Sequence, residues 1–169
     1  IRLDPIGHSH HDGLWRLAQQ RSVERYTFVP TNATEEFVPA WIQRYVDGWA
    51  EGTRAGFVVL DAHDGTFLGF GSIVQLDLDA RQGEIGYALL EESRGRGAAS
   101  GAVDLLTRWG FDELGLERLE LHIDSTNVAS QRVAERCGYR LDGVLRNLHF
   151  KEGRRCDLGI WSRLPSDPA

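Results

Sequence analysis

Residues 85–100 read IGYALLEESRGRGAAS, an apolar segment that leads into a turn of alternating arginine and glycine. Gly95 and Gly97 carry no side chain, so backbone N–H groups can approach an anion closely there. A helix that begins just after them adds unpaired N–H groups and the positive end of its dipole. Arg94 and Arg96 place formal charge beside those groups. The stretch therefore predicts a strand, a diphosphate-binding turn and a helix.

Three phosphate-binding templates can be compared with this turn. The Walker template requires Gly-Lys followed by Ser or Thr, whereas residues 97–100 read GAAS and contain no lysine. The dinucleotide template ends in glycine or alanine, where this chain has Ser100. The third template, Q/R-x-x-G-x-G/A, is matched by residues 94–99, RGRGAA. Because a glycine-rich turn alone is equally compatible with a solvated connection, the rest of the chain must decide.

Composition limits the class of protein. A chain of 169 residues, 41% hydrophobic and 26% charged, is expected to fold as a single domain over residues 1–169. The formal net charge of −6 argues against nucleic acid as a partner. We expect no membrane span, because no apolar run approaches about 20 residues. We also expect a cytoplasmic location, since no export leader precedes the domain, and we expect further natural residues before Ile1, because the chain has no methionine.

The cysteines and the histidine cluster suggest no further chemistry. Cys137 and Cys156 lie in no metal-binding or redox spacing, so we expect reduced thiols. His8, His10 and His11 have no spaced carboxylate or cysteine partner, and a solvated loop is favoured over a metal site.

Hydrophobic periodicity predicts helices first and strands afterwards. Helical spacing of apolar residues predicts helices over residues 12–20 and 34–51, the second with a capping-box start at Thr34. An antiparallel meander of strands is then predicted over residues 56–61, 67–76 and 83–90.

The second half of the chain predicts helix, strand, helix and hairpin. After the glycine turn, one helix face carries Ala99, Ala102, Val103, Leu106, Trp109 and Gly110. Residues 118–124 alternate as a half-buried strand, and Asn127 then caps a helix that buries Ser130, Val133, Ala134 and Cys137. Residues 139–150 and 155–164 form a closing hairpin. The class is therefore α+β, with one crossover through the helix after the glycine turn.

This order of elements separates the chain from dinucleotide-binding proteins, which place the glycine turn after their first strand. Here a meander precedes the turn, and the chain resembles the GNAT superfamily, specifically its RimJ/RimL-like branch of N-acetyltransferases. The resemblance runs from Ile1 to Leu164. It is carried by EIGYAL at 84–89, RGRGAA at 94–99, NVASQRVAERCGY at 127–139 and GVLR at 143–146.

The resemblance implies a mixed, mostly antiparallel sheet of roughly six to seven strands with about four helices. The sheet would splay between strands 83–90 and 118–124 and admit the pantetheine arm of acetyl-CoA or another acyl-CoA. No metal is implied, and a homodimer is possible because dimers are common in this branch. The implied cofactor-binding residues are Leu89, Leu90, Glu91, Arg94, Gly95, Arg96, Gly97, Ala98, Ala99, Ser100, Asn127 and Ser130. Arg132 and Arg136 could also reach the phosphates, although solvated side chains are favoured.

Acyl transfer from a thioester to an amine requires a neutral amine, a polarised carbonyl and support for the leaving thiolate. Strand alternation places Glu84 on one face with the small residues Gly86 and Ala88, which leave room for a ligand. Glu84 is therefore the first candidate base, acting directly or through water, with a solvated or ion-paired glutamate as an equal alternative. His122 on the opposing strand is the second candidate.

Ser130 is the candidate beside the sulfur. Its helical spacing directs it inward, and members of the resembling branch often carry a serine where other GNAT enzymes have a tyrosine acid. Because a neutral serine is a poor acid, Ser130 would mainly hydrogen-bond the thiolate. Local backbone capping is an equally good interpretation of Ser130, and capping alone is an alternative for Asn127.

The resulting hypothesis is an acyl-CoA-dependent N-acyltransferase that works by direct attack in a ternary complex. Its acceptor would be a primary amine, above all a protein N-terminal α-amine, because an α-amine with a pKa near ~8 needs less help than a lysine near ~10. A non-catalytic acyl-CoA sensor and a small-molecule amine or antibiotic acyltransferase are the alternatives. A dinucleotide oxidoreductase is disfavoured by the strand order.

Overall fold

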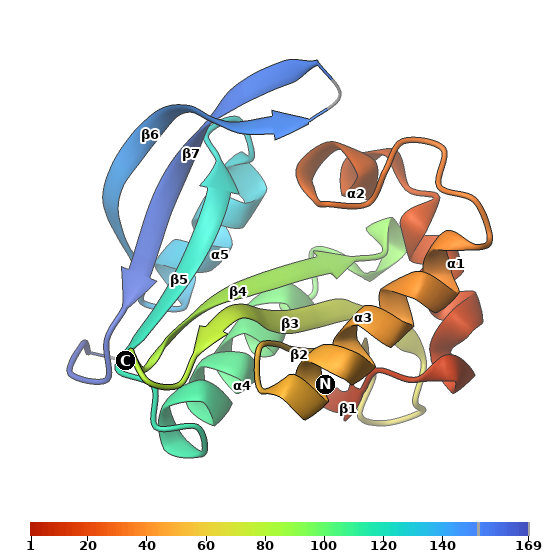
Figure 1. Cartoon of the computed structure of the whole chain (residues 1–169), viewed down its shortest axis with the longest axis horizontal. Helices are drawn as coiled ribbons and strands as arrows, with labels where there is room; N and C mark the ends of the chain where they lie inside the picture. The colour runs from red at the N-terminus through yellow and green to blue at the C-terminus, as the bar shows by residue number, and fades with distance from the viewer. Residues whose placement is uncertain (152, 169) are drawn as a thin grey trace.

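The computed structural model describes residues 1–151 and 153–168, and within them seven strands form one sheet in the order β1-β2-β3-β4-β5-β7-β6 (Figure 1). The strands are β1 (Arg2–Pro5), β2 (Ala55–Leu60), β3 (Phe67–Asp77), β4 (Gln82–Leu89), β5 (Arg118–Asp124), β6 (Arg140–Lys151) and β7 (Arg154–Arg163). The α-helices are α1 (His11–Ala18), α2 (Arg21–Tyr26), α3 (Phe37–Glu51), α4 (Ala98–Asp112) and α5 (Val128–Arg136). Two short 3-10 helices are η1 (His8–His10) and η2 (Glu91–Ser93). None of these described helices is long and apolar enough to cross a lipid bilayer.

The sheet is mixed and mostly antiparallel, which confirms the predicted fold class. β4 and β5 pair in parallel, and the other neighbouring pairs of described strands are antiparallel. The parallel pair is connected by α4, which is the crossover that the sequence order requires. The order of meander, helix, strand, helix and hairpin is likewise confirmed.

Three features at the N-terminal side differ from the sequence pattern. The pattern does not predict β1 or α2, because elements of four and six residues are too short to show a period. The expected capping box at Thr34 is wrong, since α3 begins at Phe37. The Thr34 carbonyl instead accepts the Phe37 N–H in a turn, at 2.9 Å, and no side chain caps this helix start in the described residues.

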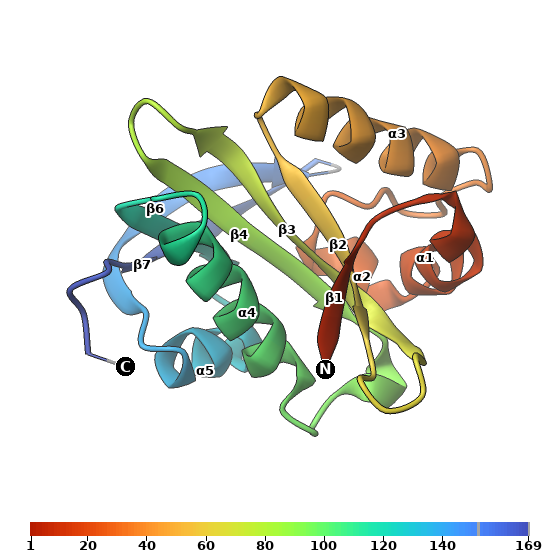
Figure 2. The same ribbon diagram turned by 90° about the horizontal axis from the view of Figure 1, so that it is seen from below.

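Helices cover both faces of the sheet (Figure 2), with α1 and α3 on one face and α4 and α5 on the other. On the first face Trp41 of α3 is buried against Phe70 of β3, edge to face, with ring centroids 5.0 Å apart. On the second face Leu106 of α4 packs in one cluster with Leu121 of β5. Each of these side chains contributes roughly 2 kcal/mol by leaving water, so both helix layers are held firmly to the strands.

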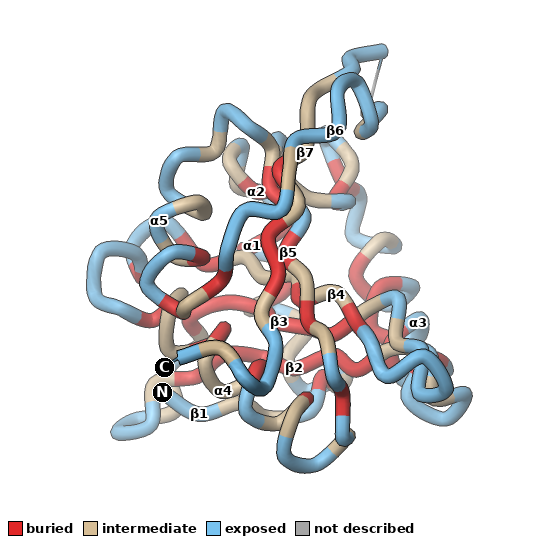
Figure 3. The backbone as a smooth tube through the Cα atoms, turned by 90° about the vertical axis from the view of Figure 1, so that its left-hand side faces the viewer, coloured by how far each residue is buried: buried red, intermediate tan, exposed pale blue. Residues whose placement is uncertain are grey.

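The sheet splays between its central strands. β4 and β5 pair only where Gln82–Glu84 meet Arg118–Glu120, and the strands then separate. In Figure 1, β5 turns away from β4 and carries β6 and β7 with it. Figure 3 shows buried backbone, in red, through the central strands and exposed backbone, in pale blue, along much of β6. Within the described part of the chain, the edge of β4 from Ile85 to Leu89 is therefore left without a strand partner on the β5 side.

Gly69 keeps β3 close to the end of β4. In the register of the sheet Gly69 lies between Val59 of β2 and Leu89 of β4. A Cβ atom added at Gly69 would collide with the Ala88 carbonyl oxygen and come within 2.8 Å of Leu89 Cα. Because those atoms belong to the backbone, the strands would have to move apart. Gly69 thus fixes the position of the β4 end at which the splay opens.

We expect Gly69→Ala to lower the free energy of unfolding by about 2 kcal/mol, since overpacking here displaces backbone. For a domain of this size the melting temperature would fall by about 4–8 °C, measured by differential scanning fluorimetry. Gly71→Ala is the matched control on the same strand, because its Cβ meets only side-chain atoms, the nearest being Leu106 Cδ1 at 3.1 Å. Equal losses in the two variants would contradict this explanation.

Candidate active site

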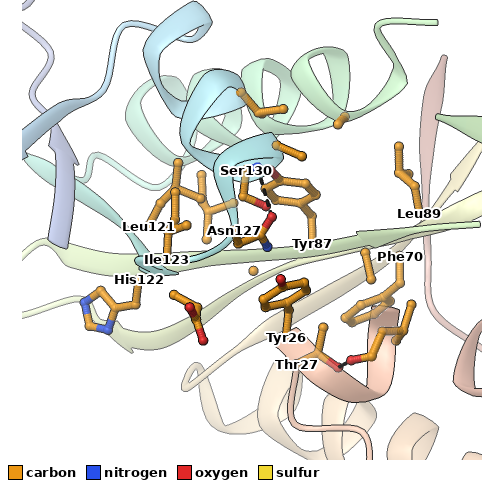
Figure 4. A pocket seen from close by; sticks show the side chains of 18 of the residues that line it. Tyr26, Thr27, Phe70, Tyr87, Leu89, Leu121, His122, Ile123, Asn127 and Ser130 are labelled. Carbon is orange, nitrogen blue, oxygen red and sulfur yellow. Dashed lines mark hydrogen bonds between the residues drawn. The ribbon is translucent and has the colours of Figure 1, made fainter. Parts of the chain in front are cut away.

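The splay opens into a cavity of about 1000 Å³. Its walls come from α2 and the loop that follows, from β3 and β4, from the turn before α4, and from β5 and the first turns of α5. Figure 4 shows side chains of β4, β5 and α5 converging on it, with Tyr26 and Thr27 on the opposite side. The volume suits an extended ligand with mixed polar and apolar parts.

The glycine turn forms one end of the cavity. Gly95 and Gly97 have φ angles of +76° and +80°, a region that side chains other than glycine rarely adopt. Gly97 is the residue before α4, and no side chain of the described residues caps that helix start. The first N–H groups of α4 therefore remain available for an anion, as the sequence predicts. A Cβ at either glycine would meet no atom of residues 1–151 or 153–168 within 4 Å, so the space beside the turn is open.

Arg94 has a structural task beside its charge. Its Nη2 donates to the Leu89 carbonyl at 2.9 Å and to Ser22 Oγ at 2.7 Å. These bonds tie the turn to the end of β4 and to α2. Arg96 instead donates to the Glu92 carbonyl, at 2.9 Å, and does not line the cavity.

Most of the predicted cofactor-binding residues line the cavity. They are Leu89, Arg94, Gly95, Gly97, Ala98, Ala99, Ser100, Asn127 and Ser130. Leu90 and Glu91 do not, and their backbone N–H groups are already bonded, to the Leu68 carbonyl and to the Gln20 side chain, both at 2.9 Å. The backbone edge that remains for a ligand is that of β4 before Leu90.

The start of α5 faces the open edge of β4. Asn127 Oδ1 accepts the Ser130 N–H at 3.2 Å, which confirms Asn127 as the cap of this helix. Ser130 follows Asn127 in the first turn of this helix and lines the cavity. Tyr87 rises from β4 beneath this turn (Figure 4). Strand alternation places Tyr87 opposite Glu84, but the sequence alone assigns it no role.

The two candidate bases, Glu84 and His122, lie together. The parallel register sets Glu84 beside Glu120, and His122 follows two residues later on the same face of β5. His122 Nδ1 lies 3.3 Å from Glu84 Oε2, and its Nε2 lies 2.7 Å from Glu120 Oε2. Arg118 continues the chain by binding Glu120 at 2.7 Å and Asp142 at 2.6 Å. The predicted pair is thus one end of a charged network across β4, β5 and β6.

Burial separates the acidities of the two glutamates. Burial raises the pKa of Glu84 above its ordinary value, and the Glu120 charge adds to this, while His122 partly offsets it. Burial also acts against the charged form of Glu120, but hydrogen bonds with His122 and Arg118 outweigh it and lower the pKa of that carboxyl. Glu84 is therefore the stronger base of the two, a property expected of a group that accepts a proton in a reaction.

The wall opposite β4 is missed by the sequence pattern. Residues 22–29, from α2 and the following loop, line the cavity except for Glu24. Lys151 Nζ at the end of β6 donates to the Thr27 and Val29 carbonyls, at 2.8 and 2.5 Å. The β6–β7 hairpin thereby contacts this wall across the cavity. No local signal indicates this contact, because it joins residues more than 120 positions apart.

The splayed sheet, with the glycine turn at one end of the cavity and the half-buried Glu84 carboxylate at the other, is the arrangement expected of an acyl-CoA-dependent N-acetyltransferase. Residues 1–140 match the family model described as "Acetyltransferase (GNAT) domain". The chain belongs to this family, as the motifs of its sequence indicate.

Relatives and solved structures agree with this assignment. YdaF of Bacillus subtilis, provisionally named a ribosomal N-acetyltransferase, is 32% identical over 88% of this chain and 81% of its own. Spermidine N(1)-acetyltransferase of Escherichia coli K12 is 28% identical over 91% of this chain and 80% of its own length.

Two solved structures with coenzyme A share the fold. Spermidine N-acetyltransferase from Vibrio cholerae, with CoA and spermine, has a TM-score of 0.86 at 21% identity, covering 98% of this chain and 96% of its own. RimL, a ribosomal L7/L12 alpha-N-protein acetyltransferase, in complex with CoA, has a TM-score of 0.87 at 20% sequence identity. The match covers 96% of this chain and 92% of RimL.

The opposite pKa shifts predict opposite effects on stability. The folded state disfavours the charge of Glu84, so stability is lost as the pH rises from the ordinary glutamate pKa through the raised pKa. We therefore expect Glu84→Gln to raise the melting temperature at about pH 7.5. The folded state favours the charge of Glu120, so Glu120→Gln should lower it at the same pH. Thermal unfolding from about pH 4 to 8 measures both, and both differences should shrink at the acid end. Changes of the same sign would contradict the assignment.

Proposed function

We propose that this protein transfers an acetyl group from acetyl-CoA directly to a protein N-terminal α-amine in a ternary complex. The observation that carries the proposal is that the anion-binding turn and the Glu84–His122 pair open onto one cavity. A thioester held along β4 and an amine held near Glu84 would therefore share the same space.

The donor half of the cavity fits coenzyme A. The pantetheine arm would add to the open edge of β4 as an extra strand does, through backbone hydrogen bonds. The diphosphate would lie on the N–H groups that begin α4, where open space surrounds Gly95 and Gly97. Arg132 and Arg136 line the same cavity from α5 and supply positive charge. Arg94 would hold the turn in position through its bonds to Leu89 and Ser22.

The acceptor half supplies the base. Glu84 takes the proton of the attacking amine, directly or through water, and its raised pKa suits that task. A backbone N–H on the β4 edge polarises the thioester carbonyl. Ser130 donates a hydrogen bond to the leaving sulfur. An α-amine with a pKa near ~8 is partly neutral near pH 7, so a single carboxylate suffices.

A polyamine is the second candidate acceptor. Glu84 and Asp124 both line the cavity and would attract a cation with more than one charge. The relatives named spermidine N(1)-acetyltransferase favour the same possibility. The α-amine remains our first choice because a ribosomal N-acetyltransferase name stands at the higher identity.

Acetyl-CoA is expected to raise the melting temperature by roughly 5–10 °C at about 100 times its dissociation constant, whereas NAD and ATP should not. Gly97→Ala should weaken this shift, because a side chain at φ +80° disturbs the N–H groups of the turn. Gly115→Ala is the control, since Gly115 has φ +66° and equally open surroundings but lies outside the cavity. Stabilisation by NAD alone would overturn the cofactor assignment.

Release of free thiol from acetyl-CoA should accelerate when a peptide with a free N-terminal amine is added, and should accelerate less with spermidine. With the same peptide, succinyl-CoA as the donor should release thiol more slowly than acetyl-CoA. Glu84→Gln should lower kcat by about 100-fold, since it removes general-base catalysis. Glu117→Gln serves as control, because Glu117 is exposed and paired with Arg81 outside the cavity. A preference for spermidine would select the second acceptor. Binding of acetyl-CoA without thiol release for any amine would identify a sensor instead.

A further inference from the structure

The hydroxyl of Tyr87 is a buried polar group for which the proposed transfer has no task. Its oxygen is enclosed, and its one side-chain partner among the described residues, Ser130, lies outside standard hydrogen-bond geometry. An unsatisfied buried hydroxyl destabilises a protein by roughly 1–3 kcal/mol, so a tyrosine here is unfavourable for the fold alone. Tyr87 also lines the cavity. Both facts point to a role for this hydroxyl when a ligand is present.

The position of the hydroxyl selects its partner. Tyr87 lies on the face of β4 opposite Glu84, beneath the first turn of α5, with Asn127 and Ser130 beside it (Figure 4). The Asn127 cap fixes the backbone of that turn, so Ser130 is held above Tyr87. A side-chain hydrogen bond with Ser130 also acts on the acidity of Tyr87, since it opposes the rise in pKa caused by burial. The two hydroxyls are thus neighbours on the wall where the thioester would lie.

Acidity decides which hydroxyl could give up a proton. Burial raises the pKa of Tyr87 to about 12. The phenol is thereby a weaker acid than an ordinary thiol, so transfer of its proton to a leaving thiolate is unfavourable. Tyr87 therefore stays protonated throughout the reaction and acts as a hydrogen-bond donor, and not as the acid.

We propose that Tyr87 is a positioning residue that donates a hydrogen bond to Ser130 Oγ and thereby directs the Ser130 hydroxyl hydrogen toward the sulfur of the leaving coenzyme A. The inference rests on the proposed acetyl transfer. In that step the C–N bond forms, the C–S bond breaks, and sulfur keeps the electron pair of the broken bond. The proton of the amine goes to Glu84, and Ser130 keeps its own proton while it stabilises the thiolate.

Two linked hydroxyls explain how a weak acid can assist this step. A hydroxyl that accepts a hydrogen bond becomes a better donor, because each bond polarises the next. The arrangement also accounts for the chain's lack of a tyrosine acid on α5, since the phenol reaches the same point from β4 and acts through Ser130.

Tyr87→Phe tests the proposal, because it removes one oxygen and keeps the ring. We expect kcat to fall about 10-fold, the effect of one hydrogen bond of roughly 1.4 kcal/mol, with KM for acetyl-CoA within about twofold. The melting temperature should stay equal or rise, since an unsatisfied buried group is removed. Tyr139→Phe is the matched control: the Tyr139 hydroxyl is bonded to Thr107 at 2.7 Å outside the cavity, so its loss should lower stability and leave kcat unchanged.

A double-mutant cycle separates a role through Ser130 from an independent one. Tyr87→Phe should have little further effect in a Ser130→Ala background. A second readout needs no turnover: the pKa of the bound coenzyme A thiol, titrated by the ultraviolet absorbance of the thiolate, should be lower with the natural protein than with Tyr87→Phe.

Three outcomes would overturn the inference. The first is an unchanged kcat in Tyr87→Phe. The second is an equal fall in kcat on Tyr87→Phe in the natural and Ser130→Ala backgrounds. The third is an unchanged pKa of the bound thiol. If the natural protein bound acetyl-CoA but acetylated no amine, the proposed function would fail. The thiol titration would still decide whether Tyr87 acts on the sulfur through Ser130.

Discussion

The short parallel pairing between β4 and β5 is the constraint on which the rest of the site depends. It extends from Gln82 to Glu84 on β4, so the strands are joined at one end and free at the other. The junction brings a carboxylate and a histidine from different strands to 3.3 Å. The separation beyond it leaves the β4 edge for a ligand. Longer pairing would close the cavity, and no pairing would lose the Glu84–His122 contact.

The two faces of β4 divide the chemistry between them. Glu84 belongs to the face covered by α1 and α3, and Tyr87 to the face covered by α4 and α5. The proposed base and the hydroxyl proposed to position Ser130 thereby lie on opposite sides of one strand. Their separation follows from period-two alternation, and burial raises the pKa of each.

Local signals could be predicted from the sequence, and contacts set by tertiary packing could not. The turn at 94–99 and the cap at Asn127 depend on neighbouring residues, and both occur as expected. The Glu84–His122 contact depends on strand register, so the sequence offers two separate candidates but not their pairing. Similarly, Leu90 and Glu91 lie in the expected turn, yet their N–H groups are bonded to distant partners, Leu68 and Gln20.

The Lys151 contacts join the β6–β7 hairpin to the loop after α2. Lys151 Nζ donates to the carbonyls of Thr27 and Val29, so this side of the cavity is closed by side-chain hydrogen bonds. β3 and β4 are instead joined by a ladder of paired residues from Gly69–Leu89 to Val74–Glu84. Contacts made by few hydrogen bonds open locally at a lower free energy than paired core strands. We therefore expect the cavity to open between the hairpin and this loop, a route for an acceptor that leaves the β3–β4 pairing intact.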